Sequence, residues 1–331
     1  MHHATATRND LAHHLNESTM SSLVPDITPR IAVLVPCYNE ALTVMDVIDG
    51  FRAALPNAEI YVFDNNSSDG TADVARKAGA IVRTETRQGK GNVVNRMFSD
   101  VEADIYIMVD GDATYDAKVV GRLIDEVRAG PYDMVNVARL AESSSAYRSG
   151  HAMGNKLMTG LVQLIFGTAT TDMLSGYKAF SRRYVKSFPT MSRGFEIETE
   201  LVVHALDLRL PISEISAPYK ERPVGSVSKL RTYSDGFRIL RLIGFLVKEE
   251  RPLAFFSTFA GMLAIVSLAT GTSIFLEFFA TGLVPRLPTA VLAAGLMISA
   301  LLALSCGLIL DTVTRGRREM KRLTYLQHRA P

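Results

Sequence analysis

The stretch IYIMVDGD, residues 105–112, joins five apolar residues to two carboxylates separated by a glycine. A short apolar run bounded by polar residues is typical of a buried strand. In open α/β sheets, ligands bind outside the carboxyl ends of the strands. The stretch therefore predicts a strand over 105–109 and places Asp110 and Asp112 at the edge of a sheet where a ligand would bind.

Similar apolar runs alternate with helical patterns on both sides of this stretch. Strands are predicted over residues 31–35, 60–63, 80–82, 105–109, 134–138 and 212–217. Helices are predicted over residues 40–55, 71–78, 92–101, 117–129, 150–165 and 196–208. This alternation predicts an α/β fold with a mainly parallel, Rossmann-like sheet covered by helices.

The last third of the chain is apolar over residues 253–279 and again over 289–310. Each run exceeds the roughly 20 residues that cross a bilayer, and the short link between them contains Pro285 and Pro288. The pattern predicts a transmembrane helical hairpin. The alternative is a buried hairpin of a soluble protein, but two such lengths side by side are uncommon in soluble cores.

Positive residues flank this hairpin. They are Arg238, Arg241, Lys248 and Arg251 before it and Arg315, Arg317, Arg318, Lys321 and Arg322 after it, whereas the link contains only Arg286. By the positive-inside rule, both termini and the large domain are cytoplasmic. The net charge of the whole chain is only +2, which does not indicate a nucleic-acid partner.

Residues 234–248 combine basic and apolar side chains at helical spacing. Ser234, Arg238, Arg241 and Lys248 fall on one predicted face, and Phe237, Leu240, Ile243 and Val247 lie away from it. A basic amphipathic helix directly before a span is typical of an interfacial helix on anionic lipid. The alternative is a surface helix that packs on the domain.

Two carboxylates at positions i and i+2 of a loop can turn towards one hard cation. Asp110 and Asp112 are so placed, and the cation would be Mg(II) or Mn(II), which takes oxygen ligands and keeps water or phosphate oxygens. Two further polar stretches follow predicted strands: PCYNE at residues 36–40 and DNNSSDGT at residues 64–71. The second is also explained by a polar turn in which Asp69 or Thr71 caps a helix.

In order and spacing, these stretches and GKGN at residues 89–92 resemble the motifs of the family 2 glycosyltransferases of the GT-A fold. The resemblance covers residues 30–250 and continues into the hairpin. It implies a nucleotide-sugar donor and a divalent metal ion bound by Asp110 and Asp112. The donor-binding residues that it implies are Pro36, Tyr38, Asn39, Glu40, Asp64, Asn66, Lys90, Asp110, Gly111 and Asp112.

Within that family, the chain resembles the polyprenyl-phosphate glycosyltransferases, which include the dolichol-phosphate mannose synthases and bacterial relatives with two C-terminal spans. The resemblance is carried by Arg139 after the fifth strand, by Asp172 before SGYKAF at 175–180, and by ERPVGSVSK at 221–229. Lys178 stands where an arginine is common. The chain has no tryptophan and so lacks the Gln-x-x-Arg-Trp motif of processive synthases.

The resemblance implies an inverting single displacement, in which a phosphate oxygen of the acceptor attacks the anomeric carbon. The implied catalytic residues are Asp112, as the direct metal ligand, and Asp172, as a base or orienting group. Asp172 is otherwise explained as a cap of its loop. The implied acceptor- or diphosphate-binding residues are Arg139, Ser175, Lys178, Arg222, Ser228 and Lys229.

Two other functions stay open: transfer to a lipid hydroxyl such as diacylglycerol, and a catalytically silent membrane module that recruits a flippase or polymerase. A nicotinamide-dependent dehydrogenase is disfavoured, because no Gly-x-Gly-x-x-Gly follows the first strand. The sequence leaves the sugar and the prenyl length open, and family resemblance allows a homo-oligomer through the hairpin.

The expected organisation has five parts. Residues 1–29 form a disordered tail, 30–231 the GT-A domain, 232–251 the interfacial helix, 252–312 the transmembrane hairpin and 313–331 a basic cytoplasmic tail. The expected location is the bacterial inner membrane, with the catalytic domain and both termini in the cytoplasm.

Overall fold

The computed structural model describes residues 29–141, 159–160, 162–163, 167, 170–223 and 232–330. The chain divides into two units, residues 1–30 and Ile31–Pro331, and the description below concerns the second unit. The predicted tail over 1–29 and the predicted helix over 150–165 lie almost wholly outside the described residues.

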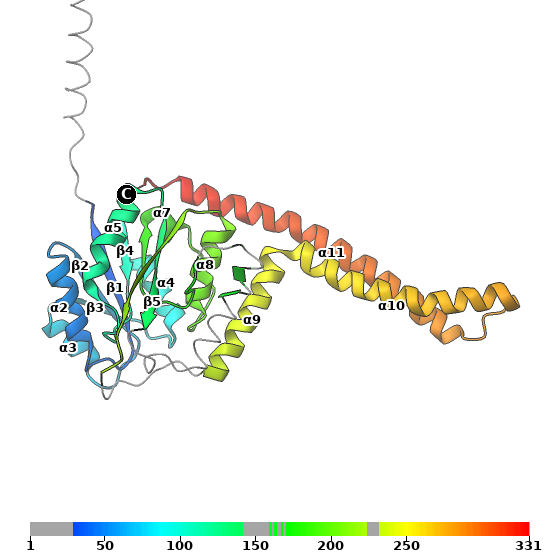
Figure 1. Ribbon diagram of the computed structural model, residues 1–331, viewed down its shortest axis with the longest axis horizontal. Coiled ribbons are helices and arrows are strands. Elements are labelled where there is room, and N and C mark those ends of the chain that lie inside the picture. Colours follow the sequence, from blue (N-terminus) through cyan, green and yellow to red (C-terminus); the bar gives the residue numbers. More distant parts are fainter. Residues whose placement is uncertain are drawn as a thin grey trace, which may run out of the picture. The chain divides into compact units, whose positions relative to one another are not determined.

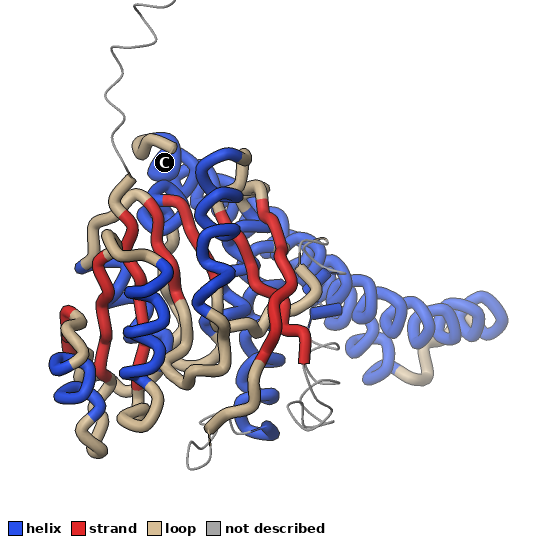
Figure 2. The backbone as a smooth tube through the Cα atoms, turned by 60° about the vertical axis from the view of Figure 1, so that its left-hand side comes forward, coloured by secondary structure: helices blue, strands red, loops and turns tan. Residues whose placement is uncertain are grey.

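A sheet forms the centre of the domain (Figure 2). It has seven strands in the order β3-β2-β1-β4-β6-β5-β7. Neighbours among β1 to β4 pair in parallel, as do β5 and β7, whereas β6 is antiparallel to β4 and β5. The strands are β1 Ile31–Cys37, β2 Glu59–Asp64, β3 Ile81–Thr84, β4 Ile105–Met108, β5 Met134–Ala141, β6 Lys178–Ser181 and β7 Ile212–Tyr219. The predicted mainly parallel sheet is confirmed.

Helices cover both faces of the sheet (Figures 1 and 2). Their bounds are α2 Val44–Ala54, α3 Thr71–Lys77, α4 Lys90–Asp100, η1 Ala117–Val119, α5 Val120–Ala129, α7 Arg182–Ser187 and α8 Ile197–Asp207. One apolar core contains buried residues of α2, α3 and α5, and a second contains those of α4, α7 and α8. Because both faces are packed, all four residues of the central strand β4 are buried, as parallel strands require.

Strand β6 and helix α7 are absent from the sequence prediction, which assigned no helix or strand between residues 165 and 196. The sequence of β6 is KAFS, four residues with a lysine at one end and a serine at the other. So short a run shows no periodicity, and its hydrogen bonds come from β4 and β5, which are distant in sequence. Ser181 then caps α7 by accepting a hydrogen bond from the Tyr184 amide at 3.2 Å.

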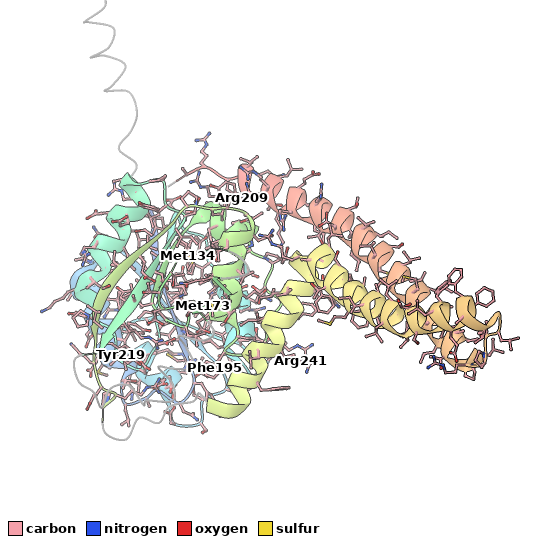
Figure 3. All side chains as sticks on the ribbon, turned by 45° about the vertical axis from the view of Figure 1, so that its right-hand side comes forward. Met134, Met173, Phe195, Arg209, Tyr219 and Arg241 are labelled. Carbon is pink, nitrogen blue, oxygen red and sulfur yellow. The ribbon has the colours of Figure 1, made fainter. Side chains whose placement is uncertain are left out.

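Helix α9, Thr232–Glu250, packs part of its surface on the domain. Ile243 and Leu246 are buried in the second core, with Val247 beside them. Phe237 and Leu240 are 70% and 44% exposed, and Arg241 is exposed with them (Figure 3). The predicted apolar face is therefore divided, because Ile243 and Val247 face the domain while Phe237 and Leu240 do not.

Helices α10, Pro252–Thr281, and α11, Leu287–Leu326, lie side by side (Figure 1). Small residues are buried at intervals of seven along both helices, at Ala260 and Ser267 of α10 and at Ala293, Ala300 and Gly307 of α11. The Ser267 hydroxyl donates to the Ala293 carbonyl at 2.7 Å. Small residues at this seam let the two backbones approach closely.

Both helices are long and apolar enough to cross a membrane. Only 11% and 17% of their most apolar windows are buried, whereas the core helix of a soluble protein is mostly buried. This exposed apolar surface favours membrane association. Helix α11 continues unbroken to Leu326, so the segment expected to be a basic tail is helical over most of its length.

Candidate active site

The loops that follow β1 and β2 are bound to each other at the carboxyl edge of the sheet. The Asn39 amide donates to the Ser67 hydroxyl at 2.8 Å, and the Ser68 amide donates to Asn39 Oδ1 at 2.8 Å. The Glu40 amide donates to the Thr71 hydroxyl at 2.8 Å. The two polar stretches at 36–40 and 64–71 therefore form one surface.

Gly111 brings the acidic loop after β4 against the end of β1. A Cβ atom at this position would lie only 2.6 Å from the Cys37 sulfur. The Thr43 hydroxyl donates to the Gly111 carbonyl at 2.6 Å and fixes the loop from the side of α2. A glycine is therefore required between Asp110 and Asp112 if the loop is to pack this closely.

Lys90, the first residue of α4, binds two carboxylates. Its ammonium lies 2.5 Å from Asp110 Oδ1 and 2.5 Å from Glu198 Oε1 of α8. Burial opposes the charge on Lys90, but Asp110 and Glu198 outweigh it and raise the pKa of Lys90. Burial likewise opposes the charge on Asp110, yet Lys90 holds the pKa of Asp110 below its usual value.

Asp112, the second carboxylate of the acidic loop, pairs with a different cation, Arg222. Arg222 Nη2 lies 2.6 Å from Asp112 Oδ2, and the Thr114 hydroxyl donates to Asp112 Oδ1 at 2.5 Å. Asp112 is only 3% exposed. Burial, followed by the neighbouring charge of Asp110, raises the pKa of Asp112 despite the arginine.

The acidic pair fits a metal ion that keeps most of its ligands from water and phosphate. No group of three or more histidine, cysteine or acidic side chains suited to a metal occurs among the described residues, so within this part of the chain Asp110 and Asp112 are the ligands that the protein would supply. Mg²⁺ is commonly held by one or two carboxylates together with substrate phosphates. Asp110 and Glu198 share Lys90, and Asp112 pairs with Arg222, so both candidate metal ligands are held in place by cations.

Arg139 and Asp172 form a second pair near the end of β5. Arg139 Nε donates to Asp172 Oδ2 at 2.6 Å, and Nη2 donates to Oδ1 at 2.8 Å. The guanidinium also lies over the ring of Tyr219, 5.4 Å from its centroid. Asp172 is thus a buried carboxylate with a fixed direction.

Gly176 joins this pair to the acidic loop. A Cβ atom at Gly176 would overlap the carboxylate of Asp110, so the backbone approaches as closely as a glycine permits. The Gly176 amide donates to the Tyr115 hydroxyl at 2.9 Å, and that hydroxyl lies 3.3 Å from the Ser175 hydroxyl. Asp110, Asp112, Arg139, Asp172, Ser175 and Arg222 therefore belong to one connected set of contacts.

Lys178 is directed into the protein interior. The side chain is fully buried, and its ammonium donates to Asn136 Oδ1 at 2.5 Å and to the Met173 carbonyl at 3.3 Å. Burial lowers its pKa to about 8. Asn136 in turn donates to the Asp172 carbonyl at 2.9 Å. Lys178 therefore stabilises, through Asn136, the loop that carries Asp172. Its predicted contact with phosphate stays a prediction, and Ser228 and Lys229 lie outside the described residues.

Asp64 presents an unused acceptor at the end of β2. Its Oδ2 accepts a hydrogen bond from the Ser67 amide at 3.2 Å, whereas buried Oδ1 has no partner in the part of the chain that the structure describes. An unpaired buried acceptor is costly unless a ligand satisfies it. Tyr38 and Asn66 are exposed on the same pair of loops, and Pro36 is half-buried at the end of β1.

Glu198, Tyr115 and Thr43 are site residues that the sequence prediction did not include. Glu198 belongs to the run EIETE at 196–200, whose spacing allows only one or two of its glutamates to face a site. The structure selects Glu198 for Lys90, because Glu200 accepts the amides of Met191 and Ser192 instead.

Residues 32–188 match the family described as Glycosyl transferase family 2. The Haloferax volcanii protein named Glycosyltransferase AglJ is 32% identical over 304 residues, which are 90% of this chain and 98% of that protein. The chain belongs to glycosyl transferase family 2. This glycosyltransferase also resembles a Haloferax volcanii dolichyl-phosphate hexose transferase, with 27% identity over 67% of this chain and 95% of the relative.

Solved structures confirm the GT-A fold of this glycosyltransferase. Glucosyl-3-phosphoglycerate synthase from Mycobacterium tuberculosis, crystallised with Mn²⁺, UDP and glucosyl-3-phosphoglycerate, superimposes with a TM-score of 0.55 and 22% identity. The match covers 67% of this chain and 80% of that structure. At this identity the likeness establishes the fold alone.

Proposed function

We propose that this glycosyltransferase moves a sugar, with inversion, from a nucleotide diphosphate donor to a polyprenyl phosphate at the cytoplasmic face of a bacterial inner membrane. The observation that carries the proposal is the pairing of Asp110 with Lys90 and of Asp112 with Arg222. A carboxylate pair flanked by two cations suits a diphosphate and its metal ion. The name of the dolichyl-phosphate hexose transferase supports a lipid phosphate as the acceptor.

The donor would lie on the surface formed by the loops after β1, β2 and β4. The free Oδ1 of Asp64 suits an N–H group of a nucleobase, and Ser67 links the other oxygen of Asp64 to Asn39. Asp110 and Asp112 would hold Mg(II) or Mn(II), which supplies positive charge to the departing diphosphate. Arg222 would exchange Asp112 for a phosphate oxygen, because a guanidinium binds both groups in the same geometry.

The acceptor phosphate would enter beside Asp172. A phosphate oxygen attacks the anomeric carbon, a new C–O bond forms, and the bond to the nucleotide diphosphate breaks on the opposite face. A phosphate monoester is already anionic near neutral pH, so this step needs little help from a base. Asp172 would orient the acceptor or remove its remaining proton, and Arg139 holds Asp172 in place.

The hairpin would place this site at the membrane surface. Helices α10 and α11 would cross the bilayer, with the basic residues at both ends on the cytoplasmic side. The exposed side chains of Phe237, Leu240 and Phe245 on α9 would enter the lipid interface next to Arg241. The acceptor's phosphate lies at this same depth, since its prenyl chain is held in the bilayer.

Transfer of radiolabel tests the proposal. Purified protein with undecaprenyl phosphate and Mg(II) or Mn(II) is offered a panel of UDP- and GDP-sugars, and butanol-extractable lipid is counted. Asp112→Asn should abolish labelling. Asp116→Asn is the matched control, because Asp116 caps the short helix η1 and an asparagine can cap it as well. A parallel reaction replaces undecaprenyl phosphate with diacylglycerol. Label in diacylglycerol alone would establish a hydroxyl acceptor, and no donor turnover at all would favour the silent membrane module.

A further inference from the structure

Helix α11 is much longer than a membrane crossing requires. Its 40 residues span about 60 Å, whereas the hydrocarbon core of a bilayer is about 30 Å thick. The apolar part ends at residue 310, and the charged residues 311–326 extend the same helix by about another 24 Å. This end of α11 returns to the catalytic domain beside α7 (Figure 1).

The charged end of α11 is tied to the domain by ion pairs. Arg318 Nη2 lies 2.6 Å from Asp207 Oδ1, at the end of α8. Lys321 Nζ lies 3.0 Å from Glu250 Oε1, at the end of α9. The side chains of Asp207 and Glu250 are only 2% and 8% exposed, so these acids depend on their partners from α11.

A further contact fastens the last turn of α11. The Tyr325 hydroxyl donates to Asp133 Oδ2 at 2.7 Å, and Arg183 lies over the tyrosine ring, 4.9 Å from its centroid. Asp133 is fully buried and also accepts a hydrogen bond from Arg183 Nε at 2.5 Å. Arg315, by contrast, pairs within the described part of the chain with Asp311 of its own helix alone, and its side chain is 73% exposed.

These contacts give the domain a second attachment to the hairpin. The covalent attachment is Arg251, the single residue between the end of α9 and the start of α10. A domain joined through one residue can pivot about it. The contacts of Arg318, Lys321 and Tyr325 remove that freedom, because they lie on a continuous helix that enters the hairpin independently.

The two elements that contact the charged end of α11, helix α8 and the start of strand β5, also carry residues of the active site. Asp207 ends α8, whose first turn carries Glu198 and so touches Lys90. Asp133 directly precedes β5, which carries Arg139, the partner of Asp172, towards its other end. A shift of the charged end of α11 would therefore move the elements that carry both pairs of the site.

We propose that residues 311–326 form a strut that holds the active site at a fixed height and orientation over the bilayer. Arg318, Lys321 and Tyr325 are then positioning residues for the membrane-embedded acceptor. The inference rests on the proposed function, because the phosphate of a lipid acceptor lies at a depth set by the bilayer. Small errors in the position of two reactants are costly in rate.

The test compares two acceptors with one enzyme. Arg318→Gln/Lys321→Gln/Tyr325→Phe is assayed in nanodiscs with undecaprenyl phosphate and, separately, with a water-soluble C10 prenyl phosphate. The expected result is a fall of about tenfold or more in kcat/KM for the long acceptor, with less than a twofold change for the soluble one. Tyr325→Phe alone should show the same selectivity to a smaller extent.

The matched control is Arg315→Gln/Arg322→Gln, which removes two positive charges from exposed positions of the same segment. It should change neither rate. Amide hydrogen exchange over residues 317–326 should be faster in the triple variant than in this control. Unchanged exchange would overturn the claim that these contacts fasten the helix end.

Equal loss with both acceptors would reduce these residues to a role in folding and overturn the proposal, as would no loss with either. Wild-type protein that transfers to neither prenyl phosphate would overturn the proposed function, and the strut with it. If the wild type transfers sugar to the prenyl phosphates and the triple variant matches its rates with both acceptors, the strut alone is overturned.

Discussion

Arg139 binds the carboxylate of Asp172 through two side-chain hydrogen bonds, from Nε to Oδ2 at 2.6 Å and from Nη2 to Oδ1 at 2.8 Å. The backbone amide of Arg139 donates to the same carboxylate at 3.1 Å. Neither residue is more than slightly exposed, with side-chain exposures of 16% and 8%. The two side-chain hydrogen bonds form a fork that holds Asp172 in one orientation. A residue that aligns an acceptor needs such a fixed orientation.

Replacing Arg139 with lysine should remove this fork while keeping the charge. A lysine offers a point charge and cannot make two parallel hydrogen bonds. Loss of one charge-assisted hydrogen bond is worth about 1.5–3 kcal/mol, so we expect kcat/KM to fall by roughly tenfold or more. Arg83→Lys is the control, since Arg83 pairs with Asp100 at the surface. Full activity of Arg139→Lys would show that the fork has no part in transfer.

Glu198→Gln should weaken the response to metal. Without Glu198, the site loses a negative charge and Lys90 acts on Asp110 alone, so a divalent cation is held less strongly. We expect the Mg(II) concentration for half-maximal activity to rise by about tenfold, which corresponds to about 1.4 kcal/mol.

Glu200→Gln provides the control on the same helix, because Glu200 binds the amides of Met191 and Ser192 rather than Lys90. It should lower the melting temperature and leave the metal titration unchanged. If both variants shift the titration equally, the local pairing of Glu198 with Lys90 is not the cause.

His204 should make the free energy of unfolding depend on pH. Burial, aided by the charge of Lys321, lowers its pKa from 6.5 to about 3. Between these values the unfolded chain binds more protons than the folded one, so the free energy of unfolding falls as the pH drops from about 6.5 towards 3.

His204→Phe should flatten this profile, because phenylalanine does not titrate. Denaturant unfolding in detergent between pH 4 and 7 measures the effect. His328→Phe, beyond the end of α11, should leave the wild-type slope in place. A slope that survives in His204→Phe would assign the acid sensitivity to other groups.

Gly307 should be the glycine of α11 least tolerant of a side chain. A Cβ atom there would lie 2.9 Å from the Cβ of Phe256, so Gly307→Leu forces α10 and α11 apart. Overpacking of this kind costs about 1–3 kcal/mol. A Cβ atom at Gly295 of the same helix would meet no atom within 4 Å, so Gly295→Leu should be nearly neutral. Thermal unfolding in one detergent compares them, and equal melting temperatures would argue against the close seam.

Strands β1, β2 and β4 could be predicted from the sequence, because each is a run of apolar residues and such a run by itself indicates a buried strand. Strand β6 does not, since KAFS gains its hydrogen bonds from β4 and β5. The sequence also does not predict that the charged end of α11 packs on the domain. A row of basic residues predicts the cytoplasmic side, but it does not distinguish free charges from those that bind Asp207 and Glu250.

The site residues also divide into those that the sequence predicts and those that only the fold reveals. Asp64 ends β2, and Asp110 and Asp112 come two and four residues after β4, so their place at the sheet edge is given by the parallel topology. The pairing of Lys90 with Glu198 joins two helices that are distant in sequence, and only the folded chain reveals it. The sequence also does not give the surroundings of Lys178: its motif predicts a ligand-binding cation, and only the fold shows that its ammonium donates to Asn136.

The most direct measurement compares undecaprenyl phosphate with undecaprenol as acceptors for the accepted nucleotide sugar, in the same nanodiscs and with the same metal. The two lipids differ only in the phosphate. The account predicts label in the phosphate-bearing lipid alone, in a product that is labile to mild acid and absent with Asp112→Asn. Label transferred to undecaprenol at a comparable rate would contradict it, because the acceptor would then be a hydroxyl.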